Sequence, residues 1–131
     1  MKHLIIILLF LTPSNDYLFA QKLKNSSGTT IGYIESGRVK SSNGTTIGYI
    51  EDGRVKNSSG NTIGYFDMTR IRNSNGSIIG YFEDNRVKNS NGSTIGYVED
   101  GRVKSSSGST FGYFEEVRRI EAVLYFFFFF Y

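Results

Sequence analysis

Two kinds of side chain that could bind a ligand recur every sixteen residues along this 131-residue chain. The tyrosines are Tyr33, Tyr49, Tyr65, Tyr81, Tyr97 and Tyr113. The arginines are Arg38, Arg54, Arg70, Arg86 and Arg102, and Arg118 continues the same spacing. Rows of tyrosine rings on a shared face can stack against sugar rings or bases. These two rows are therefore the candidate ligand-facing residues, and the partner they would fit is a glycan or an anionic polymer.

The same tyrosines also fit a purely structural role. In a small β-protein, the amphipathic tyrosine ring commonly packs in the core while its hydroxyl reaches the edge. The two interpretations differ in one observable, which is whether the tyrosine row is buried or lines an open cleft.

Carboxylates form a third row, three residues before each arginine and across an expected turn. Its members are Glu35, Glu51, Asp67, Glu83, Glu99 and Glu115. Glycoside hydrolysis needs two carboxyl groups in different environments, whereas repeated positions have nearly equivalent surroundings. We therefore expect exposed ion pairs between the acidic and arginine rows, each contributing about 0–1 kcal/mol, and no enzymatic activity.

The chemistry of histidine and cysteine is missing from most of the chain. There is no cysteine, and the single histidine is His3. Disulfides, zinc sites built from Cys and His, and histidine-based triads are excluded from residues 21–131. We expect no cofactor and no metal. The net charge of +3 is interleaved along the chain, so no nucleic-acid partner is expected.

The first twenty residues, MKHLIIILLFLTPSNDYLFA, differ from everything that follows. Lys2, an apolar block, and small Ala20 before Gln21 have the order of a secretory signal peptide. We expect residues 1–20 to be cleaved and the protein to be exported, either to the periplasm or outside the cell. The alternative is an uncleaved anchor; after cleavage the chain would not span a membrane.

Six gapless copies of one sixteen-residue unit follow the leader. They are residues 22–37, 38–53, 54–69, 70–85, 86–101 and 102–117. The segments N-S-N-G and E-D-G are typical of tight turns, and the β-branched and aromatic runs between them are typical of short strands. Each copy is predicted to form a β-hairpin, and a lone hairpin cannot bury its apolar face. Residues 21–131 are thus expected to form one all-β domain.

A glycine stands inside the second strand of every copy, in the sequence Ile-Gly-Tyr or Phe-Gly-Tyr. Strand alternation would place the Ile and Tyr side chains on one face and the glycine on the other. A glycine in a strand is commonly kept where another group approaches the backbone, such as a neighbouring tyrosine ring, or where the strand bulges. Both explanations remain open from the sequence.

The last segment, residues 118–131, leaves the repeat and ends in five phenylalanines and Tyr131. Its high β-propensity predicts a closing strand, and its apolar character on both faces predicts that it is buried. We expect this strand to close the repeats or to fill their centre.

Tandem units such as RVKNSNGSTIGYVEDG, preceded by the signal-peptide pattern and followed by AVLYFFFFF, resemble the secreted bacterial β-flower proteins with four-fold or five-fold names. The resemblance implies a closed rosette of β-hairpins about a pseudo-symmetry axis, but no biochemical activity. Six copies leave the symmetry number open. An open β-solenoid or a single-layer hairpin array is the alternative architecture.

These observations favour an exported, non-enzymatic repeat protein with a structural or protein-interaction role. Its partner would be an envelope or extracellular component. The alternative is a glycan- or anionic-polymer-binding module that uses the tyrosine and arginine rows.

Overall fold

The computed structural model describes residues 21–131, so the expected leader lies outside the described residues. The first six strands are β1 (Lys22–Asn25), β2 (Thr30–Glu35), β3 (Arg38–Ser41), β4 (Thr46–Glu51), β5 (Arg54–Asn57) and β6 (Thr62–Phe66). The next six are β7 (Arg70–Asn73), β8 (Ile78–Glu83), β9 (Arg86–Asn89), β10 (Thr94–Glu99), β11 (Arg102–Ser105) and β12 (Thr110–Glu115). Each repeat supplies two consecutive strands, and we call each such hairpin a petal.

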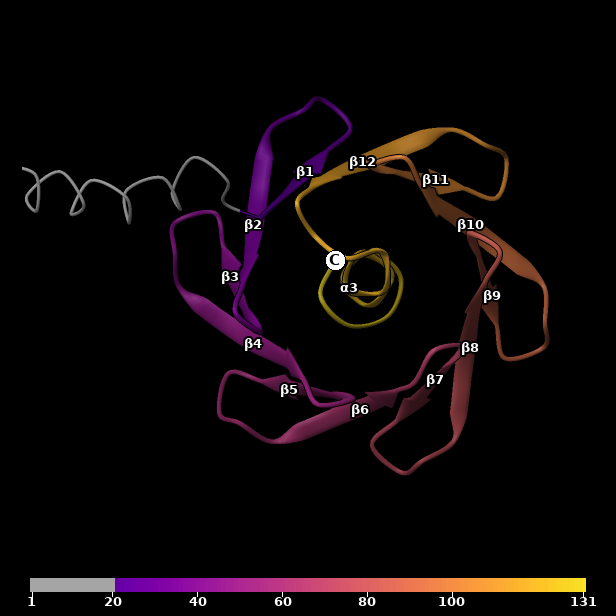
Figure 1. Cartoon of the computed structure of the whole chain (residues 1–131), viewed down its shortest axis with the longest axis horizontal. Coiled ribbons are helices and arrows are strands. Elements are labelled where there is room, and N and C mark those ends of the chain that lie inside the picture. Colours follow the sequence, from indigo (N-terminus) through magenta and orange to yellow (C-terminus); the bar gives the residue numbers. More distant parts are fainter. Residues whose placement is uncertain (1–20) are drawn as a thin grey trace, which may run out of the picture.

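The twelve strands form one closed antiparallel barrel in which every strand pairs with its neighbours in the sequence. The ring closes between the first and last petals, where β1 pairs with β12 and Lys22 lies opposite Glu115. The predicted all-β rosette of repeated hairpins is confirmed, and the alternative open array is wrong (Figure 1). Closure leaves no unpaired sheet edge, which removes the usual route to edge-to-edge aggregation.

Two kinds of turn alternate around the ring, and each has a local cause. At the outer tip of the fifth petal, Asn89 Oδ1 accepts hydrogen bonds from the backbone N–H groups of Asn91 and Ser93, both at 3.0 Å. Between the fifth and sixth petals, Asp100 and Gly101 have φ values of 51° and 76°, which are the positive angles of a type I′ hairpin turn. The Asn and Gly positions of the repeat therefore encode the turns directly.

The glycine-containing strand carries a bulge. In the fifth petal, Thr94 pairs with Lys88 and Gly96 pairs with Val87, so Ile95 is an extra residue without a partner. The expectation that Ile and Tyr share a face is wrong, because the bulge shifts the alternation at Ile. The sixth petal shows the result: Phe111, at the Ile position, packs its ring 5.6 Å from that of Phe127 in the centre.

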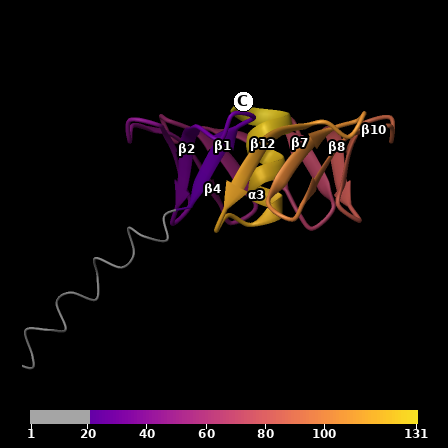
Figure 2. The same cartoon turned by 90° about the horizontal axis from the view of Figure 1, so that it is seen from above.

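The predicted closing strand at residues 118–131 is also wrong. The segment forms a short helix α3 (Arg119–Val123) that continues into a π-helix η2 (Leu124–Phe129). The closed ring leaves no edge with which another strand could pair, whereas a helix satisfies most of its backbone hydrogen bonds internally. The segment nevertheless lies where one expectation placed it, inside the ring (Figures 1 and 2).

Each petal receives one aromatic ring from the central helix or from Phe130, the residue that follows it. A methyl group added to Gly80 would lie 2.3 Å from Cζ of Phe128, so that ring occupies the space that a side chain would need. The six glycine and ring pairs are Gly32 with Tyr125, Gly112 with Phe126, Gly96 with Phe127, Gly80 with Phe128, Gly64 with Phe129, and Gly48 with Phe130. The strand glycines admit a neighbouring group as expected, but the group is a tail ring rather than a repeat tyrosine.

The π-helix suits this one-to-one arrangement. An α-helix rotates by about 100° per residue, whereas six equally spaced petals require about 60° between successive rings. Hydrogen bonding from residue i to i+5 widens the turn and reduces the rotation per residue. The N–H of Phe130 donates such a bond to the carbonyl of Tyr125 at 3.2 Å. Six consecutive aromatic residues can therefore serve the petals in order around the ring.

The core is formed between the inner faces of the petals and the helix. The buried apolar residues of the petals are Leu23, Ile34, Val39, Ile50, Val55, Ile71, Phe82, Val87, Val98, Val103 and Phe114. The helix adds Ala122, Val123, Leu124, Tyr125 and Phe126 to the same cluster. Among residues 21–131, no helix is long and apolar enough to cross a membrane.

Candidate functional site

The tyrosine row lies on the outer face of the ring and is half-buried. In β10, Gly96 faces the central helix while the next residue, Tyr97, alternates to the opposite face. None of the six repeat tyrosines belongs to the core cluster of the described residues, so their rings are partly exposed on the outer face.

Each tyrosine stands between two basic residues on the neighbouring strands. Tyr97 pairs with Arg86 on β9 and with Lys104 on β11. Directly paired residues of antiparallel strands project on the same face with adjacent Cβ atoms. The arginine row predicted from the sequence thus lies beside the tyrosine row, and its side chains are exposed. The same pairing places Arg38 opposite Tyr49, Arg54 opposite Tyr65, Arg70 opposite Tyr81, and Arg102 opposite Tyr113.

Open hollows lie between neighbouring petals, and tyrosines form part of their walls. The hollow of about 300 Å³ between the fifth and sixth petals is lined by Tyr97, Glu99, Lys104, Ser106, Ser107 and Gly108. Equivalent hollows of about 270 and 230 Å³ are lined at the corresponding positions around Tyr81 and Tyr49. We call these three the rim hollows. Each combines an aromatic ring with a carboxylate, an ammonium group and a polar turn.

The acidic row pairs with lysines rather than with the expected arginines. The pairs are Lys24 with Glu115, Lys40 with Glu35, Lys56 with Glu51, Lys88 with Glu83 and Lys104 with Glu99, at N–O distances of 2.7, 3.2, 3.5, 3.4 and 3.7 Å. The lysine reaches the carboxylate diagonally across two paired strands, a contact that sequence spacing around the turn did not indicate. The arginine side chains are left beside the tyrosines.

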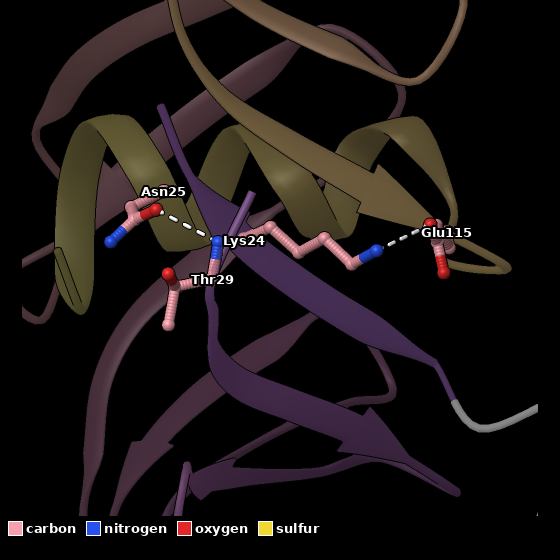
Figure 3. A network of polar contacts seen from close by, with 4 residues as sticks. All are labelled: Lys24, Asn25, Thr29 and Glu115. Carbon is pink, nitrogen blue, oxygen red and sulfur yellow. Dashed lines mark hydrogen bonds and ion pairs between the residues drawn. The ribbon is translucent and has the colours of Figure 1, made fainter. Parts of the chain in front are cut away.

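The pair between Lys24 and Glu115 joins the first petal to the last (Figure 3). Its hydrogen bond lowers the pKa of the Glu115 carboxyl below its ordinary value of 4.5. In the same view, the Asn25 side chain holds the outer turn by accepting a hydrogen bond from the N–H of Thr29 at 3.0 Å.

The third petal departs from this pattern. Asp67, one carbon shorter than glutamate, accepts hydrogen bonds at Oδ1 from the N–H groups of Thr69 and Arg70. These backbone hydrogen bonds lower the pKa of Asp67 from its ordinary value of 3.8. On β7 of the adjoining fourth petal, Arg72 occupies the lysine position and donates a hydrogen bond to the carbonyl of Gly76 at 3.1 Å. Within residues 21–131, no group of three or more potential metal ligands is brought together.

A larger hollow that sequence reasoning missed lies where the chain leaves β12 and approaches the central helix. It measures about 490 Å³ and is lined by Phe66, Asp67, Met68, Phe82, Arg118, Arg119 and Ile120. We call it the basal hollow. The sequence feature that could have indicated the basal hollow is the replacement of the usual E-D-G turn by Asp67-Met68-Thr69. The position of the hollow also depends on where residues 118–120 pack, which the sequence does not show.

The comparisons with known proteins agree with this architecture. A family model described as "5-fold beta-flower protein" matches residues 20–131. No curated protein and no solved structure gives a match. The ring has six petals, one for each pair of strands, whereas the family description specifies five-fold symmetry. On the match over its whole repeat region and tail, the chain belongs to the five-fold β-flower protein family.

Proposed function

We propose that this chain is an exported, non-enzymatic binding protein whose outer rim holds a glycan, with a preference for acidic polymers. The observation that carries the proposal is the half-exposed tyrosine row, whose rings line rim hollows and stand between paired basic residues. A protein-interaction role was the leading expectation from the sequence. The open tyrosine-lined hollows favour the glycan alternative.

The chemistry of one rim hollow fits a sugar ring. The face of Tyr97 offers an apolar platform for the C–H groups of a sugar, while Glu99 and Lys104 offer an acceptor and donors at its edge. Ser106 and Ser107 add hydroxyl groups from the adjoining turn. Arg86, which pairs with Tyr97, provides a positive charge for a carboxylate or sulfate group on the glycan.

Several weak rim sites that bind the same polymer would together give a higher affinity than one site alone. A hollow of about 300 Å³ is at the small end of ligand pockets, so a single sugar would bind weakly. A polymer that presents the same group repeatedly can occupy several rim positions, and each further contact is intramolecular. The ring geometry therefore favours a polysaccharide over a free monosaccharide.

Two features support a non-enzymatic role. Five of the six acidic-row carboxylates form the same type of exposed pair with lysine, so their surroundings do not divide them into an acid and a base. The buried carboxylate of Glu121 forms a capping interaction instead, accepting hydrogen bonds from the backbone and the guanidinium of Arg118.

Export rests on the order of charged, apolar and small residues in positions 1–20. We expect the mature protein recovered from the producing cell to begin at Gln21, which N-terminal sequencing or intact mass measurement checks. An N-terminus at Met1 in protein recovered outside the cytoplasm would contradict cleavage.

Replacing Tyr49, Tyr81 and Tyr97 together by alanine is expected to weaken glycan binding by about tenfold or more, because each aromatic platform is lost. Binding of residues 21–131 would first be surveyed on an array of neutral, uronic-acid-containing and sulfated polysaccharides. Calorimetry with the best polysaccharide would then compare the variants.

The matched control replaces the same three tyrosines by phenylalanine, which keeps the ring and should change affinity by less than about threefold. Circular dichroism would confirm that both triple variants remain folded. If the wild-type protein binds no polysaccharide, or if the alanine and phenylalanine variants bind equally well, the rim tyrosines serve only the structure.

A further inference from the structure

Departures from the repeat occur in the basal hollow and beside it, where Asn85 contacts the hollow residue Arg119. Met68 replaces a polar turn residue in the third petal, and Asn85 replaces the turn glycine in the fourth. Arg118, Arg119 and Ile120 reach the same place from the start of the tail. This clustering breaks the six-fold equivalence at one position on the ring.

The packing of the tail against the fourth petal explains why Asn85 replaces the turn glycine there. The guanidinium of Arg119 donates a hydrogen bond to Asn85 Oδ1, and its Cζ lies 5.9 Å from the ring centre of Phe82. Asn85 also tolerates the positive φ of 66° that the turn requires there. The Asn85 substitution therefore has a role within the fold.

Among residues 21–131, no comparable hydrogen bond or ring contact explains Met68. Its side chain is 90% exposed, while the turn is held by the Asp67 carboxylate and by the backbone. Phe66 is only half-buried, whereas the equivalent Phe82 and Phe114 are buried. Phe66, Met68 and Ile120 give the basal hollow an apolar surface that the fold leaves partly accessible, and the buried Phe82 ring forms its floor.

The positive charge of Arg119 at the basal hollow favours a ligand that carries a negative charge. Arg118 pairs with Glu121 at 3.2 Å, and Asp67 is engaged by turn amides. Arg119 donates a hydrogen bond to the neutral Asn85 amide and lies over the Phe82 ring, and it forms no ion pair within the described part of the chain. A carboxylate on a ligand would give Arg119 its missing acidic partner.

We propose that the basal hollow binds a small amphiphile with an apolar chain and one carboxylate, of the fatty-acid class. The chain lies over Phe66, Met68 and Ile120, and the carboxylate reaches Arg119. This site is separate from the rim hollows and does not depend on the proposed glycan binding. Its volume of about 490 Å³ falls within the range of small-molecule sites.

The test titrates residues 21–131 with hexanoate, octanoate and decanoate below their micelle concentrations, with calorimetry as the readout. Affinity is expected to rise by up to about fourfold per added methylene until the hollow is filled. Decanol, which lacks the charge, should bind about tenfold more weakly than decanoate. Absence of decanoate binding, or equal binding of decanol, would overturn the proposal.

A variant that restores the usual repeat sequence at residues 67–69 should fold well, because other petals already use that turn. The combined changes Asp67→Glu, Met68→Asp and Thr69→Gly rebuild the usual E-D-G turn and remove the exposed methionine. We expect this variant to lose at least tenfold in decanoate affinity while keeping the wild-type unfolding midpoint or raising it. Unchanged affinity would contradict the role of Met68.

Two further variants test the contact between Arg119 and the carboxylate, and the location of the amphiphile in the basal hollow. Arg119→Gln should abolish the preference for decanoate over decanol, and a retained preference would contradict the assigned carboxylate partner. The rim variant Tyr97→Ala should bind decanoate as the wild type does. A matching loss in that variant would show that the amphiphile binds at the rim hollows instead.

Discussion

Replacing Gly80 by alanine is expected to lower the free energy of unfolding by about 3 kcal/mol, a large effect for one methyl group. The added Cβ would lie 2.3 Å from Cζ of Phe128 and 2.7 Å from the carbonyl oxygen of Lys88. The half-buried ring of Phe128 packs against the core cluster, and the carbonyl belongs to the backbone of the neighbouring strand. Urea unfolding of the variant beside the wild-type protein measures the loss.

A double-mutant cycle identifies the contact responsible. In a Phe128→Ala background the ring is gone, so Gly80→Ala should cost at least about 1 kcal/mol less than in the wild-type protein. In a Phe127→Ala background its cost should be unchanged, because Phe127 covers Gly96 in the next petal. Equal costs in both backgrounds would show that the backbone contact alone makes glycine necessary.

The repeats allowed most of the fold to be predicted because they carry local information. Asn89 and Gly92 define an outer turn, Asp100 and Gly101 define an inner turn, and the same spacing returns in other petals. Six hairpins that cannot bury their faces alone must pair with each other. Ring closure between β1 and β12 was predicted by the resemblance to the β-flower proteins, which implies a closed rosette of hairpins.

The tail could not be predicted in the same way. Five consecutive phenylalanines have strong β-propensity, and nothing within that run favours a helix over a strand. The closed ring decides the outcome, because it removes every edge with which a strand could pair. The bulge at Ile95 is likewise a property of pairing between strands. Both features depend on long-range structure that local patterns do not contain.

The sequence identified the residues of the candidate site at the rim but not the contacts that they make. The tyrosine and arginine rows were identified from their sixteen-residue spacing, and strand pairing places them side by side on the outer face. The lysine partners of the acids were missed because the contact is diagonal. The basal hollow was missed because residues 67–69 become important only when the tail packs beside them.

Six of the seven aromatic rings in the tail lie against the petals, and Tyr131 is the one that covers no strand glycine. Residues 125–130 supply six aromatic rings, and each covers the strand glycine of a different petal. Because one glycine without its ring would leave a gap in the centre, petal number and aromatic run length are coupled in this fold.

Deleting residues 124–131 is therefore expected to abolish cooperative folding at 25 °C. The deletion removes buried Leu124, Tyr125 and Phe126 and exposes the inner glycine face of every petal. Truncating one buried aromatic residue to alanine typically costs about 3–5 kcal/mol, and a whole domain is stable by only about 5–15 kcal/mol. Losing the sharp urea transition, together with binding of a dye that reports exposed apolar surface, is the expected result.

Two single substitutions in the tail provide a scale for the effect of the deletion. Tyr131→Ala should lower the free energy of unfolding by no more than about 1 kcal/mol, because Tyr131 is 64% exposed and keeps only edge contacts such as its ring distance of 5.1 Å to Phe126. Phe126→Ala should cost about 3 kcal/mol, because that ring is 5% exposed and packs 5.0 Å from Tyr125. If the truncated protein instead stays soluble and melts at the wild-type temperature, the twelve-stranded ring stands without its centre. The one-ring-per-petal arrangement would then be a consequence of folding rather than its support.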